Sequence, residues 1–203
     1  MNTVERFEPQ RVSIYPYKGL NLEINADDVF KCIPRLIERL ADELLASVEI
    51  HGKVMLLRID LHANENEHSN EPVADLLRWL KQVLKRDWMA SDTGHVWSRD
   101  YGKSKGLHWH LVLMLDGNRV RNSYAITDRI KAYWCEQRGF GEVKIPHNCY
   151  THIKEVNNAD FMKGFYRASY LTKERSKFVG KHRAFGSSSL ANKVKNNPNA
   201  KYC

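Results

Sequence analysis

Two histidines separated by one residue are the part of the sequence best suited to chemistry. His108 and His110 lie within residues 106–116, a mostly apolar stretch that predicts a β-strand. Residues two apart on a strand face the same way, with Cα atoms about 6–7 Å apart, so both imidazoles can chelate one ion. A carboxylate as third ligand would extend the choice of ion to Mn or Mg. Two hydrogen-bonded histidines at the end of a buried strand would give the same pattern.

A second reactive group lies on a helix expected from about residue 159 to 173. At about 100° per residue, two tyrosines and two lysines share an arc of roughly 80°. They are Lys163, Tyr166, Tyr170 and Lys173. A tyrosine phenolate can attack a phosphodiester and form a phosphotyrosine, and a nearby lysine can stabilise the charge that develops. An ordinary amphipathic helix with solvent-facing tyrosines is the alternative.

The elements that must position these residues alternate between strands and helices. The expected order is a strand (54–62), a helix (72–88), a hairpin (95–100 and 107–115), a helix (124–137), one or two short strands (142–156) and the tyrosine helix. On the first strand, Asp60 and His62 share a polar face with Arg58. This order predicts an α+β fold, with a mainly antiparallel central sheet and helices packed on it.

Three regions are expected along the chain. Residues 1–52 form an accessory segment and helical N-terminal extension, with a helix from Asp27 to about Ser47 that is kinked or broken at Pro34. Residues 53–175 form the catalytic domain. Residues 176–203 form a basic tail, which is rich in Gly, Ser and Asn and therefore expected to be loop-like.

Charge favours an anionic partner, most often a nucleic acid. The chain carries 32 basic and 24 acidic residues, a net charge of +8. The last 30 residues contain seven Lys or Arg and one Glu, a net +6. No apolar run approaches the roughly 18 residues that span a bilayer, and the N-terminus lacks a secretory signal. We therefore expect a cytoplasmic protein without a membrane partner, whose four cysteines stay reduced.

In this order, the segments resemble the HUH endonuclease superfamily, named for two histidines that flank a bulky hydrophobic residue, here Trp109. The strand 54–61 resembles that superfamily's first motif. Residues 166–173 resemble the third motif of two-tyrosine rolling-circle replication initiators, Tyr-x-x-Lys-Tyr-x-x-Lys. Ser169 replaces the first lysine, which affects the role of Tyr166 more than that of Tyr170.

The sequence is most similar to the YagK/YfjJ C-terminal domain family of prophage proteins, which is related to inovirus-type replication proteins. The similarity rests on residues 97–100, the histidine pair and residues 183–188. It implies a site-specific single-stranded DNA endonuclease for rolling-circle-type replication of a prophage or phage element. The implied partners are single-stranded DNA or a DNA hairpin at an origin, with a host helicase as a further candidate.

The resemblance also implies a role for each site residue. A divalent ion, Mg or Mn, is held by His108, His110 and an acidic residue, with Asp100 as first candidate and Asp60 as second. Tyr170 forms the 5′-phosphotyrosine link, Lys173 assists, and Tyr166 is a second nucleophile for strand transfer. Lys103, Lys105 and the basic tail hold the DNA backbone.

Three alternatives remain open at this point. The first is a non-catalytic nucleic-acid-binding relative. The second is an HUH transposase or relaxase with the same chemistry. The third is a structural zinc site that uses His62, His108, His110 or Cys149.

Overall fold

The structure is a computed structural model that describes residues 12–27, 31–64, 67, 69–102, 106–174, 183–197 and 200–201. In this part of the chain the central sheet has six strands, in the order β6-β3-β5-β4-β8, with β7 also paired to β3. Each of these pairs is antiparallel. The strands are β3 (Val54–Ala63), β4 (Gly94–Gly102), β5 (Gly106–Asp116), β6 (Gly141–Lys144), β7 (Tyr150–Ile153) and β8 (Phe185–Ser187).

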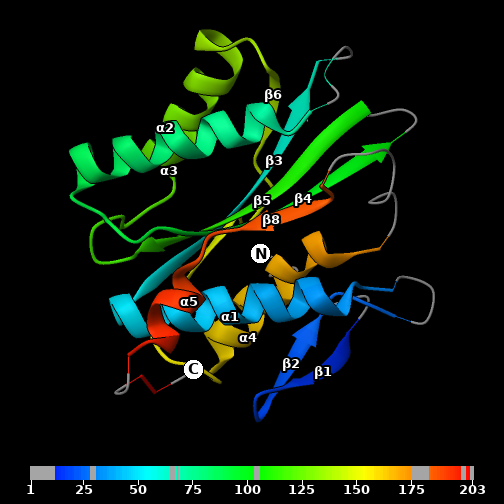
Figure 1. Cartoon of the computed structure of the whole chain (residues 1–203), viewed down its shortest axis with the longest axis vertical. Coiled ribbons are helices and arrows are strands. Elements are labelled where there is room, and N and C mark those ends of the chain that lie inside the picture. The colour runs from blue at the N-terminus through cyan, green and yellow to red at the C-terminus, as the bar shows by residue number, and fades with distance from the viewer. Residues whose placement is uncertain are drawn as a thin grey trace, which may run out of the picture.

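Helices cover both faces of this sheet (Figure 1). One face packs against α2 (Glu71–Trp88) and α3 (Tyr124–Lys131). Helix α3 continues into a π-helical turn, η1 (Ala132–Gln137). The other face packs against α1 (Pro34–His51) and α4 (Ala159–Ala168). A separate hairpin, β1 (Ser13–Tyr17) and β2 (Leu20–Ile24), lies beside these two helices. The predicted α+β fold with a mainly antiparallel sheet is confirmed.

Side chains along β3 alternate between the two faces of the sheet, and they contribute to two hydrophobic cores and one polar patch. Met55 and Leu57 point into the core under α2, and Val54 and Leu56 point into the core under α1 and α4. On the second of these faces the next alternate residues are Arg58, Asp60 and His62, which are only half-buried. The face of the sheet that packs on α1 and α4 therefore becomes polar toward the end of β3.

The first long helix differs from the sequence prediction. It begins at Pro34 rather than at Asp27, and it ends at His51, where Gly52 adopts a left-handed conformation with φ of 65°. Proline fits the first turn of a helix because its missing N–H would have no intrahelical partner there. Pro34 therefore starts α1 and does not kink it.

The tyrosine helix also differs from the prediction. Its α-helical part ends at Ala168, and a 3₁₀ turn, η2 (Ser169–Thr172), follows. The hydroxyl of Ser169 donates to the carbonyl of Tyr166, and that of Thr172 donates to the carbonyl of Ser169, both at 2.7 Å. Such local bonds compete with the α-helical pattern. The 100° rotation per residue therefore stops before Tyr170.

The C-terminal segment contains more regular structure than expected. Phe185–Ser187 is strand β8 of the central sheet, and Leu190–Lys195 forms α5, which packs on α1. The loop-like prediction is wrong for these residues because Leu190, Ala191 and Val194 have an apolar surface to pack against. Within the described residues, no helix combines the length and apolarity required to cross a membrane.

Candidate metal centre

The polar patch at the end of β3 extends across three neighbouring strands. On β3 and β5, Asp60 pairs with His110 and His62 pairs with His108. On β5 and β4, His110 pairs with Ser98 and His108 pairs with Asp100. Directly paired residues on antiparallel strands point to the same face. Strand register alone therefore gathers these six polar side chains: Asp60, His62, Ser98, Asp100, His108 and His110.

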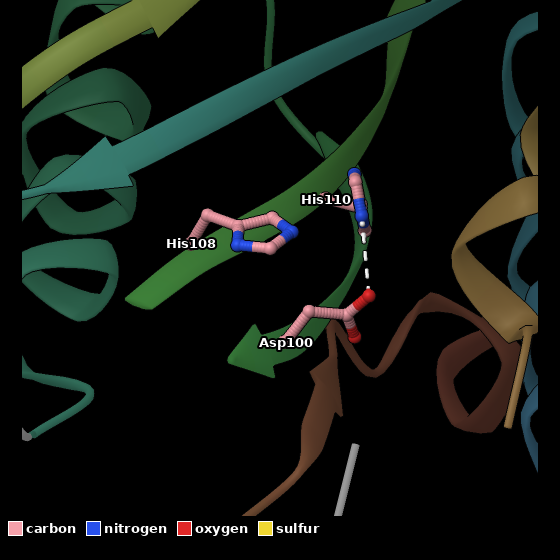
Figure 2. A group of neighbouring side chains, drawn as sticks. All are labelled: Asp100, His108 and His110. Carbon is pink, nitrogen blue, oxygen red and sulfur yellow. Dashed lines mark ion pairs between the residues drawn. The ribbon is translucent and has the colours of Figure 1, made fainter. Parts of the chain in front are cut away.

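Three of these side chains form a group that could hold a metal ion. Asp100, His108 and His110 are buried, and each offers one ligand atom within 4.8 Å of the others. Oδ2 of Asp100 lies 3.4 Å from Nε2 of His110. Figure 2 marks this pair with a dashed line. The two histidines of β5 and the acid of β4, eight residues apart in sequence, therefore meet as predicted.

Asp60, the second candidate for the acidic ligand, contacts the other nitrogen of His110. Nδ1 of His110 lies 2.7 Å from Oδ1 of Asp60, and Nη2 of Arg58 lies 3.1 Å from Oδ2. Burial raises the pKa of Asp60, but the His110 hydrogen bond and the Arg58 charge outweigh it and lower that pKa to about 2. Asp60 is therefore a carboxylate that accepts a hydrogen bond from Nδ1–H of His110, which leaves Nε2 of His110 as the nitrogen with a lone pair.

His108 is held in a similar way by the backbone. Its Nδ1 lies 3.3 Å from the carbonyl oxygen of Gly106, and its ring stacks on that of His62, with centroids 5.2 Å apart. Burial lowers the pKa of His108. A neutral imidazole that donates from Nδ1 has its Nε2 lone pair available for a metal.

Tyr170 lies against this centre. Its ring meets that of His110 edge-on, with centroids 5.2 Å apart. Two cations flank the same ring: the guanidinium of Arg58 at 4.1 Å and the ammonium of Lys173 at 4.5 Å from its centroid. The tyrosine and lysine predicted from sequence therefore lie beside the predicted histidine pair.

Tyr166 has a different environment. Its side chain is buried, and its hydroxyl accepts a hydrogen bond of 3.0 Å from the amide of Asn25. Tyr166 therefore does not face solvent, as the alternative of an ordinary amphipathic helix would require. The hydroxyl of Ser169 also accepts a bond of 2.8 Å from the backbone N–H of Asn25.

Hydrogen bonds from the N-terminal part of the chain hold the segment that carries Tyr170 at both ends. Beyond Asn25, the backbone N–H of Ile33 donates to the carbonyl of Thr172 at 2.8 Å. The N–H of Glu174 donates to the carbonyl of Lys31 at 2.9 Å. These contacts could not be found from sequence because about 140 residues separate the partners. One feature of the sequence could have identified Arg58 as a site residue: it lies two residues before Asp60 on the polar face of β3.

Other predicted DNA contacts lie outside the described residues. They are Lys103 and Lys105 and, in the basic tail, Arg175, Lys177 and Lys181.

The family model of the YagK/YfjJ C-terminal domain matches residues 30–188. That span includes the three candidate ligands, Arg58 and the whole tyrosine segment. No curated protein matches the chain.

Proposed function

The chain belongs to the YagK/YfjJ C-terminal domain family, and we propose that it is an HUH-type endonuclease that nicks single-stranded DNA with a tyrosine. Its role would be rolling-circle-type replication of a prophage or phage element. The observation that supports this most is the edge-on contact of Tyr170 with His110. A candidate nucleophile and a candidate metal ligand, 60 residues apart in sequence, touch each other on the polar end of the sheet.

The donor set fits a divalent cation. Two imidazoles and one carboxylate are typical ligands of transition ions, and the carboxylate also suits Mn or Mg. His108, His110 and Asp100 would hold the ion, and Asp60 would orient His110. A bound divalent ion would polarise the scissile phosphate and offset the negative charge that develops on it.

Tyr170 would perform the covalent step. Its phenolic oxygen loses its proton and forms a bond to phosphorus, while the bond from phosphorus to the 3′ oxygen breaks. The 3′ oxygen takes up a proton and leaves as a hydroxyl, and the 5′ phosphate stays on the tyrosine. Arg58 and Lys173 flank the Tyr170 ring and would stabilise negative charge on the phenolate and the phosphate.

Tyr166 would act later, in strand transfer. Its hydroxyl is bound to Asn25, so this bond would have to break before Tyr166 could attack a phosphotyrosine link. Tyr170 has the cationic neighbours that the first step needs. We therefore assign the first nick to Tyr170.

A trapping assay tests this function. The purified chain is incubated with a pool of single-stranded oligonucleotides in Mn or Mg, and the products are separated under denaturing conditions. We expect a covalent protein–DNA adduct that depends on the metal and is lost with EDTA. Salt-sensitive binding of single-stranded DNA without any adduct would instead identify a non-catalytic nucleic-acid-binding protein.

A further inference from the structure

A pocket of about 230 Å³ lies beside the candidate metal centre, and its lining includes two residues with a role in the chemistry proposed above, Arg58 and Tyr166. It is formed by β3, β5, α4 and the turn between β6 and β7. Leu56, Val112 and Ala168 contribute apolar surface to its lining, and Arg58, Asn148 and Arg167 contribute hydrogen-bonding groups. This mixture suits a small, flat ligand with apolar faces and a polar edge.

Arg58 connects the pocket to the tyrosine. The same side chain lines the pocket, lies over the ring of Tyr170 and pairs with Asp60. Tyr166 also lines the pocket. An occupant of this pocket would therefore be one side chain away from the residue that attacks the phosphate.

We propose that this pocket binds one base of the single-stranded DNA, adjacent to the phosphate that Tyr170 attacks, and that it prefers guanine. The proposal rests on the proposed function. In single-stranded DNA each base is one sugar away from its phosphate, so a phosphate held at Tyr170 brings a neighbouring base to Arg58. Proteins that act on single strands hold unstacked bases between side chains in this way.

The size and chemistry of the pocket support a base. Its volume is below the roughly 300–1,000 Å³ of sites for drug-sized ligands, so it suits one base rather than several nucleotides. The apolar side chains of Leu56 and Val112 would be unsuitable in a site for phosphate alone. Guanine presents two acceptors, O6 and N7, on one edge, and arginine is their commonest partner.

Titration with uncharged deoxynucleosides tests the pocket without metal or cleavage. The methyl groups of Leu56, Val112 and Thr151 line the pocket, whereas those of Leu76 and Leu113 lie in the core on the other face of the sheet. In methyl NMR spectra, deoxyguanosine should shift the first set in a saturable way and leave the second unchanged. Thymidine, deoxycytidine and deoxyadenosine should bind more weakly.

Two variants and a control complete the test. Arg167→Ala should weaken deoxyguanosine binding about 10-fold, the factor that corresponds to a loss of about 1.4 kcal/mol. Thr151→Tyr should fill the pocket and abolish deoxyguanosine binding. Arg119 is an exposed arginine outside the pocket, so the control variant Arg119→Ala should bind deoxyguanosine with wild-type affinity. If Arg167→Ala does not fold, Thr151→Tyr alone carries the comparison.

Several outcomes would overturn the proposal. Absence of any shift at the pocket methyl groups excludes a base site, and equal shifts with inorganic phosphate indicate a general anion site. Equal affinity for all four nucleosides overturns the guanine preference. An adduct in the trapping assay without nucleoside binding would refute the pocket alone. Nucleoside binding without an adduct would refute the endonuclease and leave a base-binding protein.

Discussion

His110 donates a hydrogen bond of 2.7 Å from Nδ1 to Asp60 on β3 and faces Asp100 on β4 with its other nitrogen. The two acids on either side of one imidazole therefore have different tasks. Asp60 keeps the proton of His110 on Nδ1, and Asp100 belongs with His108 and His110 to the group that could bind a metal. A carboxylate–histidine pair of this kind orients the ring and raises the basicity of the ligating nitrogen.

The first prediction separates these two tasks. Asp100→Ala or His108→Ala removes a ligand and should eliminate measurable Mn binding in calorimetry. Asp60→Asn keeps an acceptor for Nδ1 but loses the charge, so the affinity should fall by about 10-fold, the lower end of the range for such partners. His51→Ala, at the last residue of α1 and before the start of β3, is the control. A larger loss with Asp60→Asn than with Asp100→Ala would make Asp60 the ligand.

The second prediction concerns the basic C-terminal segment. Helix α5 packs beside Gly94, at the start of β4, while Asp100 lies six residues further along, about 20 Å away. Lys195→Gln on α5 should therefore leave the salt dependence of single-stranded DNA binding unchanged. Neutralising Lys177, which lies outside the described residues but follows Lys173 by four, should reduce the slope of log affinity against log salt by about one. Equal slopes in both variants would argue against a phosphate contact by Lys177.

The third prediction concerns how the same segment is attached. The buried carboxylate of Glu43 on α1 accepts hydrogen bonds from the hydroxyl of Ser188 and from the backbone N–H groups of Leu190 at 3.2 Å and Ala191 at 3.4 Å. Glu43→Ala would leave these donors without their acceptor, at a cost of about 1–3 kcal/mol. Urea denaturation measures this loss, and Glu136→Ala, an exposed acid, is the control. Unchanged stability of Glu43→Ala would show that α5 docks without this carboxylate.

The fourth prediction concerns the pH dependence of stability. Burial lowers the pKa of His95 from 6.5 to about 4. Below pH 6.5 the unfolded chain therefore binds a proton that the folded chain does not, so the unfolding free energy falls between pH 6.5 and 4, by up to about 3 kcal/mol from this group. Lys81, Asp92 and Lys193 line the same pocket as His95. In His95→Gln, this part of the decline should disappear from denaturation curves measured at pH 7, 5.5 and 4. A decline as steep as that of the wild type would assign the pH dependence to other groups.

The histidine site was predictable because strand geometry is simple. A period of two places His108 and His110 on one face, and a hairpin with a short connection returns Asp100 beside them. Asp100 was ranked before Asp60 only through the family resemblance, because strand periodicity does not distinguish the two acids. Both lie on the same face next to the histidines, and only the register between three strands decides which atom faces which nitrogen.

The tyrosine segment shows where periodicity alone fails. The helix was predicted, but its change to a 3₁₀ turn depends on hydroxyl bonds of Ser169 and Thr172 to nearby carbonyls. The hydroxyl of the buried Tyr166 binds Asn25, a partner 141 residues away. Long-range contacts of this kind leave no local pattern in the sequence, so two tyrosines four residues apart were expected to share one environment and do not.

The last prediction concerns the nucleophile. Tyr170→Phe should abolish covalent adduct formation and preserve metal and DNA binding, because only the attacking oxygen is removed. Its ring contacts with His110 and Arg58 do not require the hydroxyl, so the stability cost should be about 0.5 kcal/mol or less. Tyr166→Phe should leave the first nick intact and impair strand transfer. It should also cost about 1 kcal/mol of stability, because the amide of Asn25 loses its acceptor.

Mass spectrometry of the trapped adduct separates the two tyrosines, and Asn25→Ala provides a further comparison. This substitution removes the side-chain bond to Tyr166 but leaves its own backbone bond to Ser169. It should therefore remove the contact of Asn25 with the hydroxyl of Tyr166 and leave the position of Tyr170 unchanged. A nucleotide attached to Tyr166 in the wild-type protein would reverse the assignment. Adduct formation by a protein with both tyrosines changed to phenylalanine would rule out a tyrosine nucleophile at this site.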